Sequence, residues 1–147
     1  MLTIDDGSFQ SGNTFSDIFD FDEYHEVRLN EPWNSETDED KKIAAIISSF
    51  DFFKIQKWKS DVFLLGCPDR IKEAHFVAAN KELSSPGTLQ ADKDSSNIKR
   101  KRIEGAIDTE YFNSQDGSET IFTEINNLIQ TYLISTQTRV SRRMVRR

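Results

Sequence analysis

The sequence predicts a mainly α-helical protein of one domain, with a four-helix bundle as its body and a long extended arm or hairpin before the last helix. Three observations predict this fold. Apolar residues recur at helical spacing in four segments, each opened by a residue favoured at helix starts. A long polar stretch, residues 84–117, separates the third segment from the fourth. A length of 147 residues is enough for one domain with its own core.

The first two predicted helices are separated by a proline. Asp17 is a suitable N-cap for a helix of about 18–29, and Pro32 breaks the chain after it. Thr37 is the expected cap of the second helix, which extends to about Trp58. Its predicted core face consists of Ile43, Ile46, Ile47, Phe50 and Phe53 or Lys54.

The third helix is expected to begin at Pro68, a residue tolerated at the first helical position. It carries a narrow stripe of mostly small residues, which lets helices approach closely: Ile71, Ala74, His75, Ala78 and Ala79. Residues 84–97 form a polar loop, and 98–112 show the partial alternation of an arm or hairpin. Ser118 should cap the fourth helix, whose apolar face is Ile121, Phe122, Ile125, Leu128, Ile129, Tyr132 and Leu133.

Charge is distributed unevenly along this acidic chain, whose formal net charge is −6. Residues 1–50 carry twelve acids and three bases, whereas 51–147 carry thirteen acids and sixteen bases. This asymmetry would suit a ring or stack with opposite charges at opposite ends.

Two basic clusters stand out. The first lies in the arm: Lys99, Arg100, Lys101 and Arg102. The second lies in an extended C-terminal tail, 136–147, which follows a helical domain of residues 1–135. Its candidate contact residues are Arg139, Val140, Arg142, Arg143, Met144, Val145, Arg146 and Arg147. Arginine gives charge-assisted bonds to carboxylate or phosphate, so both clusters are candidate binding segments.

The sequence offers no catalytic constellation, so we do not expect an enzyme. His25 and His75 each lie alone on a predicted helix, and Cys67 has no obvious base near it. The chain lacks metal-ligand spacings and Gly-rich phosphate loops, so neither a metal nor a cofactor is expected. No apolar run approaches the ~18 residues that a membrane span needs.

The order of segments resembles a known family. "IDDGSFQSGNTF", then "DFDEYHEVRLNEPWNSETDEDKKIAAIISSFDFF", then "CPDRIKEAHFVAANKEL", and later "IDTEYF" before a basic tail, are similar to head–tail connector (adaptor) proteins of tailed bacteriophages. Members are often labelled DnaT-like single-stranded DNA-binding proteins. The resemblance covers nearly the whole chain, and the order of motifs carries it. The Phe-rich first helix and "KRKR" depart from the family pattern.

This resemblance implies that the four-helix bundle is of the adaptor type and that the protein is a structural part of the virion neck, assembled in the host bacterial cytoplasm. Such adaptors form a ring, usually a dodecamer, beneath the portal protein, and they present a surface to the next neck or tail protein. The ring continues the channel for genomic DNA, which the basic arm would meet non-specifically. The C-terminal tail would be the portal-docking peptide, with Val140, Met144 and Val145 as apolar anchors.

Two other functions stay open on the sequence alone. A single-stranded nucleic-acid-binding protein would need aromatic platforms among its basic residues, and salt-dependent affinity for short strands would favour it. A small acidic inhibitor or immunity-type protein would use the first 40 residues to mimic nucleic acid, and it would be a monomer that binds one toxin or nuclease.

Overall fold

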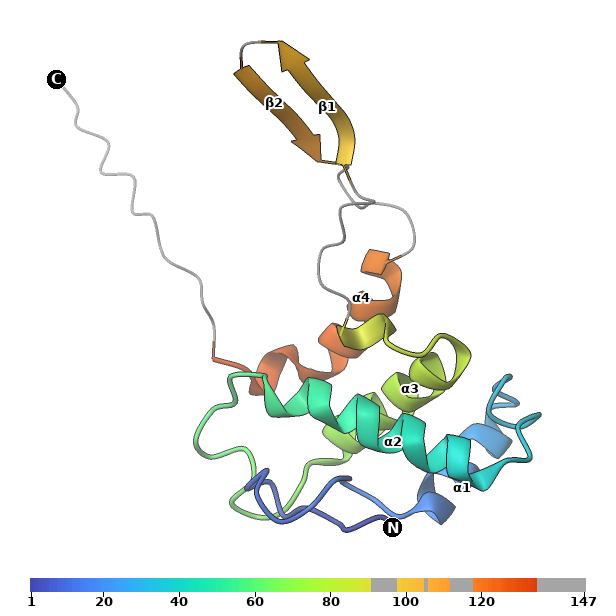
Figure 1. The fold of residues 1–147 in the computed structure, drawn as a ribbon. Helices are drawn as coiled ribbons and strands as arrows, with labels where there is room; N and C mark the ends of the chain where they lie inside the picture. Colours follow the sequence, from blue (N-terminus) through green and yellow to red (C-terminus); the bar gives the residue numbers. More distant parts are fainter. Residues whose placement is uncertain (91–97, 105, 112–117, 135–147) are drawn as a thin grey trace, which may run out of the picture.

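The computed structural model describes residues 1–90, 98–104, 106–111 and 118–134. In these parts of the chain, four α-helices and an antiparallel hairpin follow one another as Figure 1 shows. Their bounds are α1 Ile18–Val27, α2 Glu39–Lys54, α3 Asp69–Ser84, β1 Ile98–Glu104, β2 Ala106–Tyr111 and α4 Ser118–Ile129, with 3-10 turns η1 Thr88–Gln90 and η3 Gln130–Tyr132. The predicted fold class is confirmed, because the protein is mainly helical and a hairpin precedes its last helix.

The first two helices are capped by aspartates. Asp17 caps α1 as predicted, because its carboxylate accepts the backbone N–H of Asp20 at 3.1 Å. The cap of α2 is Asp38 and not the predicted Thr37, since Asp38 Oδ1 accepts the N–H of Asp40 at 3.1 Å. A carboxylate at this position also interacts favourably with the helix dipole.

The starts of α3 and α4 differ from the prediction by one residue. Pro68 is the N-cap of α3 and not its first residue, with an extended ψ of 143°. The fourth helix begins at Ser118 itself, which was the predicted cap. Differences of one residue are normal at helix ends, where few hydrogen bonds define the boundary.

The second helix ends at Lys54, four residues before the predicted end at Trp58. Tertiary contacts explain the early end. Trp58 forms an isolated antiparallel bridge with Leu133, and its indole packs parallel to Phe9 at 6.2 Å and Phe53 at 6.4 Å between ring centroids. The chain has to leave the helix before Trp58 to make these contacts.

The main core forms where α2 and α4 pack against α3 (Figure 1). The predicted small-residue stripe of α3 is confirmed, since all five of its members are buried. The alanines on this face allow its neighbours to approach closely. The buried members of the main core are Phe15, Phe50, Phe52, Phe53, Ile71, Ala74, Val77, Ala78, Leu89, Ile125 and Ile129.

The buried face of α2 is broader than predicted. Ile46, Phe50 and Phe53 have no exposed surface, as expected. Ile43 and Ile47, however, are only partly buried. The other buried positions are Ala45, Ser49 and Phe52. The helix is turned relative to the predicted stripe because it contacts α3 and also η1, the turn that follows α3.

A smaller core attaches α1 to the start of α2. It contains Phe21, Trp33, Ile46 and Ala79. The indole Nε1 of Trp33 donates to Asp22 Oδ1 at 2.8 Å, and Lys42 Nζ pairs with the same oxygen at 2.9 Å. The salt bridge therefore fixes α1 beside the first turn of α2.

A buried carboxylate organises the N-terminal loop. Asp5 is 2% exposed, and its oxygens accept the backbone N–H groups of Gly7, Phe9 and Gly12 at 2.8–2.9 Å. Phe9 has a positive φ of 58°, and its ring lies 5.4 Å from that of Phe63 in an edge-to-face contact. The loop thus inserts an aromatic side chain into the core, a role that its turn-rich sequence did not predict.

A neutral histidine lies at the contact between α2 and α3. His75 is fully buried, and its Nε2 donates to the carbonyl of Ile46 at 3.1 Å. The rings of Phe15, Phe21 and Phe53 surround it at 5.0–5.4 Å. Burial among these rings lowers the pKa of His75 to about 4.

We predict that Phe50→Ala lowers the free energy of unfolding by about 3–5 kcal/mol, because the ring is fully buried. Ile47→Ala should cost less than about 2 kcal/mol, since that side chain is partly exposed. Urea unfolding measures both. The control Ile55→Ala, at a position 76% exposed, should change stability by less than about 0.5 kcal/mol. Equal losses for Ile47 and Phe50 would mean that Ile47 is buried as deeply as Phe50, as the stripe predicted from the sequence has it.

Stability should fall as the pH drops from about 6.5 to about 4. The pKa values of His25 and His75 are lowered to about 4 from 6.5, mainly by burial. In this window the unfolded chain binds protons that the folded chain does not, so the stabilisation is complete above pH 6.5 and decreases below it. Urea midpoints between pH 7.5 and 4, with the imidazole NMR shifts, test this. Histidine shifts that titrate near 6.5 in the folded protein would contradict it.

Candidate nucleic-acid interface

The hairpin presents the first basic cluster on β1. The two strands are antiparallel and in register from Arg100↔Glu110 to Glu104↔Ala106, with an irregularity between Ile98 and Arg100. The β-branched residues Ile103 and Ile107 occupy opposite positions, as is common in strands. The predicted arm is therefore a hairpin, and all four basic residues of "KRKR" belong to its first strand.

The register sets acidic positions opposite two of the four bases. Arg100 stands opposite Glu110, and Arg102 stands opposite Asp108. Lys101 stands opposite the neutral Thr109. The two strands together carry four bases and three acids, so their net charge is +1. Opposite charges across a pair attract one another, so the hairpin has less positive charge for a polyanion than "KRKR" suggests.

The second basic cluster, residues 136–147, lies outside the described residues, and its portal-docking role stays a prediction. The described residues end at Ile134, shortly before it. Ile134 N–H donates to the carbonyl of Lys57 at 2.8 Å, and Lys59 N–H donates to that of Tyr132 at 2.9 Å. Lys59 Nζ donates to the carbonyl of Thr131 at 2.7 Å. Residues 131–134 therefore lie beside two lysines of the segment that follows α2.

These lysines were not among the functional candidates identified from the sequence. "KIQKWK", residues 54–59, places three lysines around an indole, a pattern that suggests a nucleic-acid surface. A widely open hollow of about 630 Å³ is lined by Lys54, Trp58, Lys59 and Phe63, among others. This pattern of lysines around a tryptophan is visible in the sequence, although it is short and lies outside both basic clusters.

The aromatic rings of this region pack against one another. Trp58 lies nearly parallel to Phe9 and Phe53, with ring centroids 6.2 and 6.4 Å away, and its Nε1 donates to the Phe53 carbonyl at 2.9 Å. Of the nine phenylalanines whose side chains the structure describes, eight belong to or pack against the two cores, and Phe19 is 76% exposed. The lysines of residues 54–59 are therefore better placed to contact phosphate than these phenylalanines are to stack on bases.

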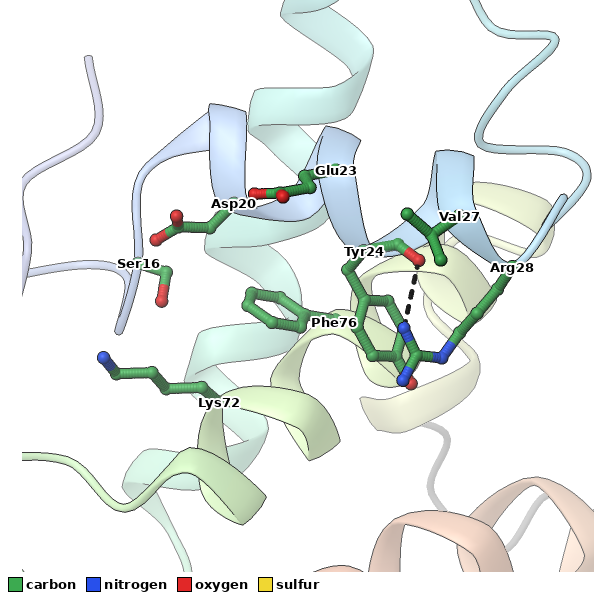
Figure 2. A pocket seen from close by; sticks show the side chains of 8 residues that line it. All are labelled: Ser16, Asp20, Glu23, Tyr24, Val27, Arg28, Lys72 and Phe76. Carbon is green, nitrogen blue, oxygen red and sulfur yellow. Dashed lines mark hydrogen bonds between the residues drawn. The ribbon is translucent and has the colours of Figure 1, made fainter.

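A separate hollow lies between α1 and α3 (Figure 2). Its volume is about 390 Å³. The guanidinium of Arg28 lies over the Tyr24 ring at 3.7 Å from the centroid and reaches Glu73 at 3.7 Å. Asp20 from α1 and Lys72 from α3 bring opposite charges to this hollow. Burial raises the pKa of Tyr24 to about 12, so its hydroxyl stays protonated and donates to Glu73 at 3.3 Å. The mixed charges do not favour a nucleic acid here.

The remaining nucleophilic and basic side chains have structural roles. Burial raises the pKa of the Cys67 thiol to about 12, which keeps it protonated. His25 Nε2 donates to the Phe76 carbonyl at 3.1 Å, while its Nδ1 accepts from Asn30 at 3.0 Å. Among the described residues, no group of three or more His, Cys, Asp or Glu side chains could hold a metal ion. None of the described helices combines the length and apolar character of a membrane span.

Comparison with known proteins adds one finding. A family model described as "Putative DnaT-like ssDNA binding protein" matches residues 65–147, which include α3, the hairpin, α4 and the tail. No curated protein and no solved structure matches the chain. The matched part exceeds half of the sequence and contains both basic clusters. The chain therefore belongs to this DnaT-like family.

Proposed function

We propose that the protein is a non-catalytic structural protein whose C-terminal half binds single-stranded DNA weakly and without sequence preference. The observation that carries this proposal is the family match over residues 65–147, because the family is named for single-stranded DNA binding and both basic clusters lie in the matched part. Arginine and lysine contact phosphate through charge, and such contacts carry no sequence information.

The charge pattern supports weak binding. Acidic positions stand opposite two of the four bases in the hairpin. Lys99 and Lys101 lack such a partner in the register. The tail adds five arginines and no acid. The net charge of the chain is −6, which opposes tight association with a polyanion. A protein of this kind would release DNA readily.

We predict that replacing Lys99, Arg100, Lys101 and Arg102 by Ser weakens binding to a labelled oligothymidylate in fluorescence anisotropy. Each phosphate contact on a single strand contributes about 0.7 to the salt slope of log K. Since two of the arginines stand opposite acids, the slope should fall by about 1.4, the value for two contacts, rather than about 2.8 for four.

The matched control replaces Lys41 and Lys81, two lysines of the helical body, by Ser. It should leave the salt slope of DNA binding unchanged, because neither residue belongs to a basic cluster. Wild-type protein without salt-dependent affinity for the oligonucleotide would overturn the DNA-binding proposal.

The setting that we propose for this contact is the neck of a tailed phage, where the protein would be a ring subunit between portal and tail. The resemblance in segment order supports this setting. The division of the chain into a helical body and a hairpin also supports this setting. Large apolar side chains are exposed on the body: Ile4, Phe19, Val27, Leu29, Ile55, Leu64, Leu65 and Ile134. Contacts with neighbouring subunits would cover such residues. Weak DNA contact suits a channel, because a tight grip would stall the passing genome.

Deleting residues 136–147 should leave a folded, helical protein with near-normal thermal stability, because the core and the bridge at Leu133 precede the deleted segment. If the tail is the portal anchor, the truncated protein should no longer co-sediment with portal-bearing, DNA-filled heads. Full-length protein is the control. Normal sedimentation of the truncated protein with the heads would rule out the tail as the main anchor.

A further inference from the structure

The exposed side of α1 forms an acidic face that carries large apolar side chains. We define the acidic face as Phe19, Asp20, Glu23, Glu26 and Val27, all of which are exposed. Phe19, Glu23 and Val27 are four residues apart and form one row along the helix. Phe19 is 76% exposed and Val27 is 75% exposed. The three acids take part in no ion pair within the described part of the chain.

A second exposed surface follows the C-terminal end of α2. We define this basic end as Ile55, Lys57, Lys59, Leu64 and Leu65. The exposed fractions of its apolar members are 76% for Ile55, 77% for Leu64 and 103% for Leu65. Lys59 Nζ donates to a neutral carbonyl, and neither Lys57 nor Lys59 takes part in an ion pair in the described ranges.

Acids near the basic end reduce its charge without reversing it. Lys54 pairs with Asp51 at 3.3 Å, and the exposed Asp61 lies between Lys59 and Leu64 in the chain. The segment of residues 51–65 therefore keeps a small positive charge, whereas the acidic face carries three acids and no base, with Arg28 and Lys72 at the hollow beside it. The two surfaces are complementary in charge, and each contains apolar side chains that a partner would cover.

The two surfaces lie at opposite ends of α2. The pair between Lys42 and Asp22 fixes α1 beside the first turn of α2, and Ile55 directly follows its last residue. A helix of 16 residues is about 24 Å long. Figure 1 shows α1 near one end of α2 and the loop before α3 at the other end. One subunit therefore cannot cover its own acidic face with its own basic end.

We propose that the acidic face of one copy docks on the basic end of the next copy, so that identical subunits associate head to tail. Contacts between two different surfaces repeat from copy to copy and close into a ring when the rotation allows it. The apolar side chains would supply affinity, while the charges would fix orientation and disfavour pairing of two acidic faces. This inference rests on the ring proposed above and names the surfaces that build it.

Charge-reversed variants in analytical ultracentrifugation test the inference. Glu23→Lys and Lys57→Glu should each weaken self-association at least about tenfold, because like charges would meet at every contact. An equimolar mixture of the two variants should restore assembly, since every contact then joins either two original or two exchanged charges. A contact between two identical surfaces would not be restored in this way.

Two further variants separate charge from other effects. Asn126→Lys with Asn127→Lys adds two positive charges at exposed positions of α4, which equals the charge change of Glu23→Lys, and should leave assembly unchanged. Leu65→Ser should weaken assembly while leaving the circular dichroism spectrum unchanged, because the Leu65 side chain is fully exposed.

The possible outcomes distinguish the inference from the proposals on which it rests. If the wild-type protein assembles and neither reversal weakens it, or if mixing fails to restore it, these surfaces do not form the contact, and the ring proposal stands. If the wild-type protein stays monomeric at high concentration, the head-to-tail contact and the ring are both overturned. DNA binding, measured by anisotropy, is independent of either result.

Discussion

The contact between α2 and α3 is the constraint on which the rest of the structure depends. Small side chains at Ala74 and Ala78 bring the two helices together, and the hydrogen bond from His75 to the Ile46 carbonyl crosses the contact. The imidazole must stay neutral there, because a charged ring among phenylalanines would lack solvation. α4 then packs on α3 through Ile125 and its neighbours, which completes the main core.

The N-terminal loop and the segment after α2 close the open side of this core together. Asp5 holds the loop by accepting three backbone N–H groups, so that Phe9 can pack parallel to Trp58. Trp58 in turn forms the bridge with Leu133 at the end of the described body. The end of the described body, Leu133 and Ile134, is thus fixed by residues from distant parts of the sequence, and the same contacts place Lys57 and Lys59 beside it.

Charge connects the fold to the proposed function. The acids of α1 and the first turn of α2 lie near one end of α2, whereas Lys54, Lys57 and Lys59 lie at or just beyond the other. Twelve of the nineteen basic residues of this acidic chain lie in the hairpin, the tail and residues 54–59, which supports the proposal that binding is weak and oriented. The family match supports contact with single-stranded DNA, and the segment order supports a neck ring as the setting.

The sequence by itself determined the local structure: four helices, the cap at Asp17, the small-residue stripe of α3 and the hairpin before α4. Spacing and capping chemistry act over a few residues, so a sequence pattern predicts them directly. Only the tertiary structure decided the end of α2, the turned core face and the insertion of Phe9, because contacts between distant segments determine them. The same holds for the site. Composition identified "KRKR", but strand register decided that Arg100 and Arg102 stand opposite acids, since register depends on pairing between two strands.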